Sequence, residues 1–185
     1  MEKSALQIAR AAYQPKLPAG LRGNVKIVEG APTQSVDNQE EIKALFPNTY
    51  GMPLVNFEPT DEKKEYAPIN IGIILSGGQA PGGHNVICGL YDGLKKQNPN
   101  SKLYGFLMGP GGLVDHNYLE MTDELIDEYR NTGGFDMIGS GRTKLERREQ
   151  FDKGLEILKE LGISALVIIG GDDSNTNAAV LAEYY

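Results

Sequence analysis

The chain has 185 residues, of which 40% are hydrophobic and 23% charged, as in an ordinary soluble globular protein. Its net charge is −7 and it has no basic stripe, which argues against nucleic acid as a main partner. No apolar run approaches the ~18 residues of a membrane span, and Cys88 is the only cysteine. We therefore expect a cytoplasmic protein that has no internal disulfide and does not bind membranes.

Residues 1–69 have the character of an N-terminal extension. Segment 5–13 is helix-like, the short apolar run "VKIVEG" (25–30) follows, and five prolines then interrupt the sequence between positions 32 and 68. This stretch has too little periodic sequence for an independent domain. We predict an irregular, partly helical extension packed on the segment that follows it.

From residue 70 onward, continuous apolar runs alternate with helical periodicity. The runs "INIGIILSGG" (69–78) and "KLYGFLMG" (102–109) predict two strands, the first of them buried on both faces. Between these strands, residues 83–96 predict a helix that Pro99 ends.

Three more segments continue the alternation. The acidic stretch 118–130 predicts a solvated helix, and "FDMIGSGR" (135–142) predicts a short strand. Thr143 and Glu146 have the spacing of a capping box, which predicts that a helix begins there. The run "ISALVIIGG" (163–171) predicts a buried strand.

This order of strands and helices predicts an α/β fold. We expect residues 70–185 to form a Rossmann-like three-layer domain with a mostly parallel sheet and right-handed crossovers. We also expect this domain to be incomplete, because ligand sites of open α/β sheets draw on several strand ends.

The loop "SGGQAPGGHN" (76–85) follows a strand and precedes a helix, where backbone N–H groups favour an anion. Gly77 and Gly82 have the spacing of a P-loop, but Gly-His follows where that motif needs Lys and Ser or Thr. The loop is thus either a phosphate site or a tight turn that needs glycine. His84 could contact a ligand or pack locally, and its pairing with Cys88 lacks a third metal ligand.

A second glycine-containing loop, "GSGRTK" (139–144), is predicted at the same edge of the sheet. The guanidinium of Arg142 could neutralise a transferring phosphoryl group there. Arg142 could equally be a surface arginine paired with an acidic residue.

The third loop, "GGDDS" (170–174), places two carboxylates before a helix that we predict to be capped by Ser174. A carboxylate beside a phosphate is repulsive unless a metal lies between them. Asp172 is therefore a candidate ligand of a Mg²⁺ ion that bridges to phosphate oxygens. This reasoning leaves Asp173 without a role.

These three loops, in this order, resemble the phosphofructokinase family, and more closely its pyrophosphate-dependent branch in the long form with an N-terminal extension. The resemblance implies that Gly77 and Gly78 contact pyrophosphate, that Arg142 contacts the transferring phosphate and that Ser174 belongs to the same binding site. It also implies Mg²⁺ as the cofactor, coordinated by Asp172.

The resemblance supplies a role for Asp173 as well. The ATP-using branch typically has glycine at this position, and an aspartate would fill and charge the space that the α-phosphate of ATP needs. We therefore place Asp173 with Arg142 among the catalytic residues, as the one that decides between pyrophosphate and ATP.

The activity implied by the resemblance is phosphoryl transfer from pyrophosphate to fructose 6-phosphate in glycolysis, by a homo-oligomer. The family's catalytic aspartate lies in a "PKTIDND"-like segment after the third loop. This chain contains no such segment, so we expect it to be inactive alone. The alternatives are an ATP-dependent phosphofructokinase, a non-catalytic phosphate-binding or regulatory subunit, and a dinucleotide-binding domain, which the missing G-x-G-x-x-G disfavours.

Overall fold

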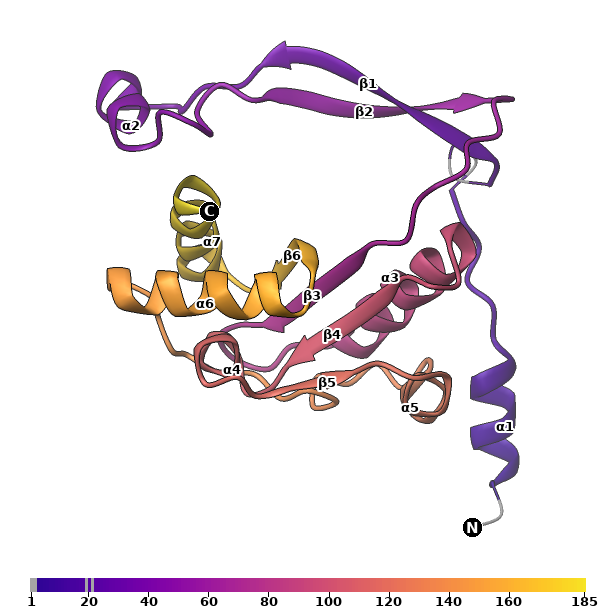
Figure 1. Cartoon of the computed structure of the whole chain (residues 1–185). Helices are drawn as coiled ribbons and strands as arrows, with labels where there is room; N and C mark the ends of the chain where they lie inside the picture. Colours follow the sequence, from indigo (N-terminus) through magenta and orange to yellow (C-terminus); the bar gives the residue numbers. More distant parts are fainter. Residues whose placement is uncertain (1–2, 19, 21) are drawn as a thin grey trace. The chain divides into compact units, whose positions relative to one another are not determined.

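A four-stranded sheet is the centre of the first of two units into which the chain divides (Figure 1). The computed structural model describes residues 3–18, 20 and 22–185. Within these residues, no helix has both the length and the apolar character needed to cross a membrane. The first unit comprises the described parts of Met1–Tyr13, Tyr66–Ala178 and Tyr185, and the second those of Gln14–Glu65 and Ala179–Tyr184.

Three parallel strands of the first unit lie where the apolar runs predict them. They are β3 (Asn70–Leu75), β4 (Lys102–Phe106) and β6 (Ile163–Ile169), and the short β5 (Tyr118–Glu120) pairs antiparallel with β4, in the order β5-β4-β3-β6. Ile73 and Ile74 point to opposite faces of β3, and both are fully buried. The predicted α/β class with a mostly parallel sheet is therefore confirmed. The burial predicted for the strand at 163–171 is wrong, because β6 lies at the edge of the sheet and its residues are half-buried or exposed.

Helix α3 (Gly83–Gln97) follows β3 and confirms the helix predicted for residues 83–96. Ile87 and Tyr91 of α3 are buried in a hydrophobic core that also contains side chains of β3 and of α5 (Asp123–Tyr129). This core holds the helix that follows the first glycine loop firmly on the sheet.

The single helix predicted for residues 118–130 is wrong. The first three residues of this stretch form β5, because they pair with the edge of β4. Helix α5 begins only after Thr122, whose hydroxyl accepts a hydrogen bond from the Leu125 N–H (3.3 Å). A short helix that the sequence analysis missed, α4 (Pro110–Val114), starts with a proline, which needs no N–H partner there.

The strand predicted for residues 135–142 is also wrong. This segment makes an isolated parallel bridge between Gly141 and Ser76, and Met108 N–H donates to the Ile138 carbonyl (2.8 Å). Ile138 is nevertheless buried in the core. The apolar residues of the segment are therefore buried by tertiary contacts, although the segment does not make the continuous hydrogen bonds of a strand.

Helix α6 (Arg148–Glu160) begins later than the predicted capping box at Thr143. The side-chain oxygen of Gln150 accepts the backbone N–H groups of Glu146 (3.1 Å) and Arg147 (3.0 Å), which lie just before the first turn. The true N-terminal cap is therefore made by a glutamine further along the chain.

The last helix, α7 (Asp172–Tyr184), begins two residues before the predicted cap. Ser174 therefore lies inside the first turn and does not cap it. Asp172 and Asp173 become the first two helical residues, so their carboxylates stand at the helix N-terminus.

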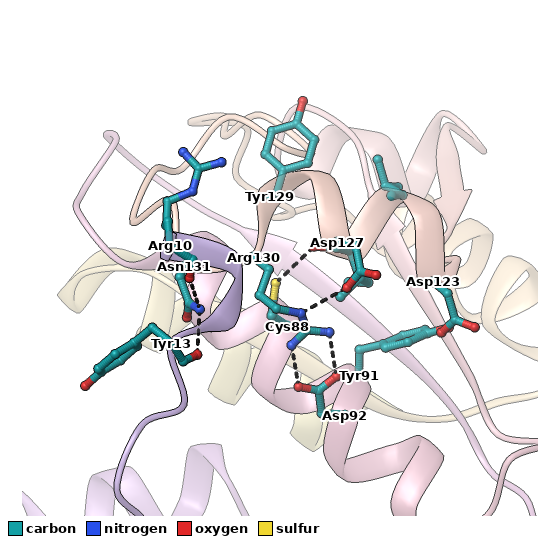
Figure 2. A network of polar contacts seen from close by, with 12 residues as sticks. Arg10, Tyr13, Cys88, Tyr91, Asp92, Asp123, Asp127, Tyr129, Arg130 and Asn131 are labelled. Atoms are coloured by element: carbon teal, nitrogen blue, oxygen red, sulfur yellow. Dashed lines mark hydrogen bonds and ion pairs between the residues drawn. The ribbon is translucent and has the colours of Figure 1, made fainter. Parts of the chain in front are cut away.

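Helix α1 (Ala5–Ala12) confirms the helix predicted near the N-terminus. The side-chain amide of Asn131 donates to the carbonyls of Arg10 and Tyr13, both at 2.9 Å (Figure 2). The Arg10 carbonyl also accepts the Tyr13 N–H (3.2 Å), so Asn131 adds a second bond to it and gives the Tyr13 carbonyl a partner beyond the end of α1.

An ion-pair network ties α3 to α5 next to this contact (Figure 2). The guanidinium of Arg130 lies 2.7 Å from a carboxylate oxygen of Asp92 on α3 and 3.0 Å from one of Asp127 on α5. The network therefore reinforces the packing of two helices that share one core.

The second unit is more regular than the sequence analysis predicts. Strand β1 (Asn24–Pro32) contains the predicted run 25–30, and it pairs antiparallel with β2 (Pro53–Thr60), which the analysis missed. Helix α2 (Gln39–Leu45) lies between them in the sequence. The prolines that argued against a strand are tolerated because both strands of a two-stranded sheet are edge strands.

Two glycines of α3 give opposite expectations for replacement by alanine. A Cβ at Gly83 would collide with the Phe135 ring, whereas a Cβ at Gly89 would meet no described atom within 4 Å. We expect Gly83→Ala to lower the free energy of unfolding by about 1–3 kcal/mol through overpacking. We expect Gly89→Ala to raise it by about 0.5–1 kcal/mol. Urea unfolding measures both, and equal stability of the two variants would contradict this packing.

Candidate functional site

A hollow of about 380 Å³ opens where the loops after β3 and β6 meet the segment that leads to α6. The structure brings every residue that the sequence analysis assigned to a site to this place. These residues are Gly77, Gly78, Arg142, Asp172, Asp173 and Ser174. The remaining lining residues, which the analysis missed, are Ser76, Thr143, Lys144, Gly171 and Asn177.

Close backbone contact joins the first two loops. Gly77 has a φ of +93°, and its N–H donates to the Gly141 carbonyl (2.8 Å). A Cβ at Gly141 would overlap the Met108 carbonyl oxygen. Glycine is therefore required at both positions, one for its backbone conformation and one for the lack of a side chain.

A pair of buried hydroxyls joins the first loop to the third. Ser174 Oγ donates to Ser76 Oγ (2.8 Å), and both residues are buried. A Cβ at Gly170 would overlap Ser174 Oγ. This contact fixes the start of α7 against the end of β3.

The guanidinium of Arg142 lies beside the first loop. A Cβ at Gly78 would be only 3.2 Å from Arg142 Nη2, so glycine leaves the room that the guanidinium occupies. Arg142 makes no hydrogen bond or ion pair with any residue that the structure describes. Its charge is therefore available to an anion in the hollow.

The two aspartates at the start of α7 have different surroundings. Asp173 is exposed, and its Oδ2 lies 3.6 Å from Lys144 Nζ. The Asp172 carboxylate has no partner within the described part of the chain. Both carboxylates stand at the N-terminus of α7, where the helix dipole favours negative charge.

Asn177 and Lys144 are two further lining residues with defined contacts that the sequence did not predict. The Asn177 side chain accepts the Leu145 N–H (3.1 Å) and donates to the Leu145 carbonyl (2.7 Å). The spacing of four residues from Asp173 to Asn177 puts both on one face of a helix, a signal that was available in the sequence. Lys144 stands in the quoted second loop, but nothing local marks it as a partner of Asp173.

His84 packs locally, which resolves one of the two possibilities left open by the sequence. It is 2% exposed, and Nε2 accepts the backbone N–H groups of Asp136 (2.9 Å) and Met137 (3.0 Å). Nδ1 bonds to the Thr132 hydroxyl, which itself donates to the Tyr129 carbonyl. This pattern needs a neutral ring with its proton on Nδ1. Burial lowers the pKa of His84, and the Asp136 carboxylate opposes that shift.

A metal site made only of protein side chains is not found in the described ranges, which contain no group of three His, Cys, Asp or Glu residues suited to one. Both ring nitrogens of His84 are engaged, and the thiol of Cys88 donates to the Ile126 carbonyl (3.7 Å). Magnesium sites beside phosphates need only one or two carboxylates, since phosphate oxygens and water complete them. The unpartnered carboxylate of Asp172 fits a site of that kind.

Comparison with known proteins gives strong sequence similarity. A sequence model of the family described as "Phosphofructokinase" matches residues 70–185. The pyrophosphate–fructose 6-phosphate 1-phosphotransferase of Porphyromonas gingivalis is 68% identical over 185 residues, which is 100% of this chain and 34% of that protein. The protein of the same name from Entamoeba histolytica is 51% identical over 187 residues, again 100% of this chain and 34% of that protein. The chain thus spans about a third of the length of these curated relatives.

A solved structure shares the fold. The crystal structure of Pichia pastoris phosphofructokinase in the T-state aligns with a TM-score of 0.52 and 28% identity, covering 65% of this chain and 13% of that chain. About two thirds of this chain therefore shares its fold with a protein whose structure was solved by experiment.

The buried neutral His84 should make folding stability pH-dependent. Because its pKa is lowered in the folded state, the unfolded chain takes up a proton first as the pH falls below about 6.5. We expect the free energy of unfolding to decrease from about pH 7.5 to about pH 5.5, and to decrease less in His84→Gln. Urea unfolding at the two pH values measures this. An equal decrease in both proteins would show that His84 is not the responsible group.

Proposed function

Since the chain belongs to the phosphofructokinase family, we propose that it forms the phosphate-donor side of an enzyme that transfers a phosphoryl group from pyrophosphate to fructose 6-phosphate. The observation that carries this proposal is the hollow in which Arg142 of the second loop meets Asp172 and Asp173 of the third. The names of the Porphyromonas and Entamoeba relatives, which match the whole of this chain, support the choice of donor and acceptor.

Pyrophosphate binds, in this proposal, between the first loop and the start of α7. The backbone N–H of Gly78 and those of the first turn of α7 are suited to phosphate oxygens. Gly77 contributes to the shape of the loop, because its own N–H donates to the Gly141 carbonyl. Arg142 adds a positive charge that neutralises the transferring phosphoryl group. Ser174 contributes through its position, because its hydroxyl proton is used to fix Ser76.

Mg²⁺ is the cofactor in this proposal, and Asp172 holds it. When bound, the ion neutralises phosphate charge and helps to orient the donor. Asp172 is suited to this role because its carboxylate lines the hollow and lacks a partner among the described side chains.

The proposed reaction breaks the P–O–P bond of pyrophosphate and forms a P–O bond to the 1-oxygen of fructose 6-phosphate. The hydroxyl proton passes to a base, orthophosphate leaves, and fructose 1,6-bisphosphate is formed. Positioning and charge neutralisation supply most of the catalysis in such a transfer. An aspartate after the third loop as the base, a homo-oligomeric enzyme and a cytoplasmic location stay predictions.

Asp173 selects the phosphoryl donor in this proposal, because it admits pyrophosphate and excludes ATP. Its carboxylate stands next to Asp172 and lines the same hollow, so it restricts the space and the charge that a donor meets. ATP would bring an additional phosphate into that space, whereas pyrophosphate would not.

Assay of the full-length protein with each donor tests the proposed activity. We expect turnover with pyrophosphate and little with ATP. Strict dependence on ATP would contradict the proposal, and absence of transfer with either donor would favour a phosphate-binding subunit.

Replacement of Asp173 tests whether this residue excludes ATP. We expect Asp173→Gly to raise kcat/KM with ATP by about tenfold or more, because both the side-chain volume and its charge are removed. Asp173→Asn keeps the volume and removes the charge, so we expect a smaller gain. If neither variant accepts ATP better than the unaltered enzyme, Asp173 does not select the donor.

A further inference from the structure

Lys144 and Asp173 form an ion pair beside the hollow. Lys144 Nζ lies 3.6 Å from Asp173 Oδ2, and the two side chains are 53% and 79% exposed. An exposed pair of this kind adds little to folding stability. Because both residues line the hollow, the pair matters mainly to an anion that binds there.

A second contact shows that the fold places these two residues together. Asn177 lies one helical turn after Asp173 on the same face of α7, and it makes two hydrogen bonds to the backbone of Leu145. Leu145 follows Lys144 directly and is fully buried. The backbone that carries Lys144 is thus fixed against the helix that carries Asp173.

The charges in the hollow explain how the ion pair of Lys144 and Asp173 affects the binding of pyrophosphate. Pyrophosphate carries several negative charges, so an uncompensated carboxylate at Asp173 would repel it. The ammonium group of Lys144 offsets that repulsion and leaves the volume of the Asp173 side chain in place. A larger donor would still meet that volume.

We propose that Lys144 is a further specificity-determining residue of the donor site. It compensates the charge of Asp173, so that this side chain can exclude a larger donor without weakening the binding of pyrophosphate. The inference rests on the proposed function. In this role Lys144 strengthens the binding of pyrophosphate only while Asp173 is charged. A lysine that contacted the donor directly would strengthen binding whether or not Asp173 were charged.

A double-mutant cycle on the full-length protein tests this dependence. The four forms are the unaltered protein, Lys144→Met, Asp173→Asn and the double variant, and calorimetry with pyrophosphate and Mg²⁺ measures the affinity of each. We expect Lys144→Met to weaken binding by about tenfold or more. In the Asp173→Asn background we expect the same change to cost less than about threefold, because no charge is left to compensate.

Two further variants control the cycle. Lys144→Arg keeps the charge and should retain affinity within about threefold. Lys153→Met removes an exposed lysine of α6 outside the hollow and should change nothing. An equal loss from Lys144→Met in both backgrounds, or no loss in either, would overturn the inference.

The cycle separates this inference from the proposed function. If the unaltered protein uses only ATP, the proposed activity fails, and the cycle is repeated with inorganic phosphate as the anionic probe. A loss of phosphate affinity that depends on Asp173 would still support charge compensation by Lys144. A loss that does not depend on Asp173 would overturn it.

Discussion

The close approach of the backbone at residues 139–141 to its neighbours is the constraint on which the site depends. Gly141 lies against the Met108 carbonyl, and its own carbonyl accepts the Gly77 N–H (2.8 Å). Gly109, which has a φ of +84°, also lies against the backbone of Gly141. Side chains at these positions would separate the loops. Because the contact fixes the start of the second loop, Arg142 and Lys144 reach the hollow from an anchored backbone.

The charge arrangement follows from where that backbone lies. The second loop brings two cations to the hollow, and the start of α7 brings two carboxylates. One of these cations, Lys144, forms an ion pair with one of the carboxylates, Asp173. The remaining two, Arg142 and Asp172, have no side-chain partner in the residues that the structure describes. A hollow with one available cation and one available carboxylate suits a phosphate compound that carries a divalent metal.

The sequence predicted the parts of the fold whose signals are local. Strands β3, β4 and β6 are continuous apolar runs. The site residues of the first and third loops follow the ends of β3 and β6, which a parallel sheet brings together. The strand predicted for 135–142 was wrong because its apolar residues are buried by tertiary contacts, which leave the same pattern as a strand. The pairing of Lys144 with Asp173 could not be predicted, since it arises from a contact between residues far apart in the chain.

The most direct measurement is a crystal structure of the full-length protein with Mg²⁺ and imidodiphosphate, a pyrophosphate analogue that resists transfer. Our account predicts its two phosphoryl groups in the hollow, contacting Arg142 and the backbone N–H of Gly78, with the metal on Asp172. An analogue bound away from these loops, with Arg142 and Asp172 not in contact with it, would contradict the account.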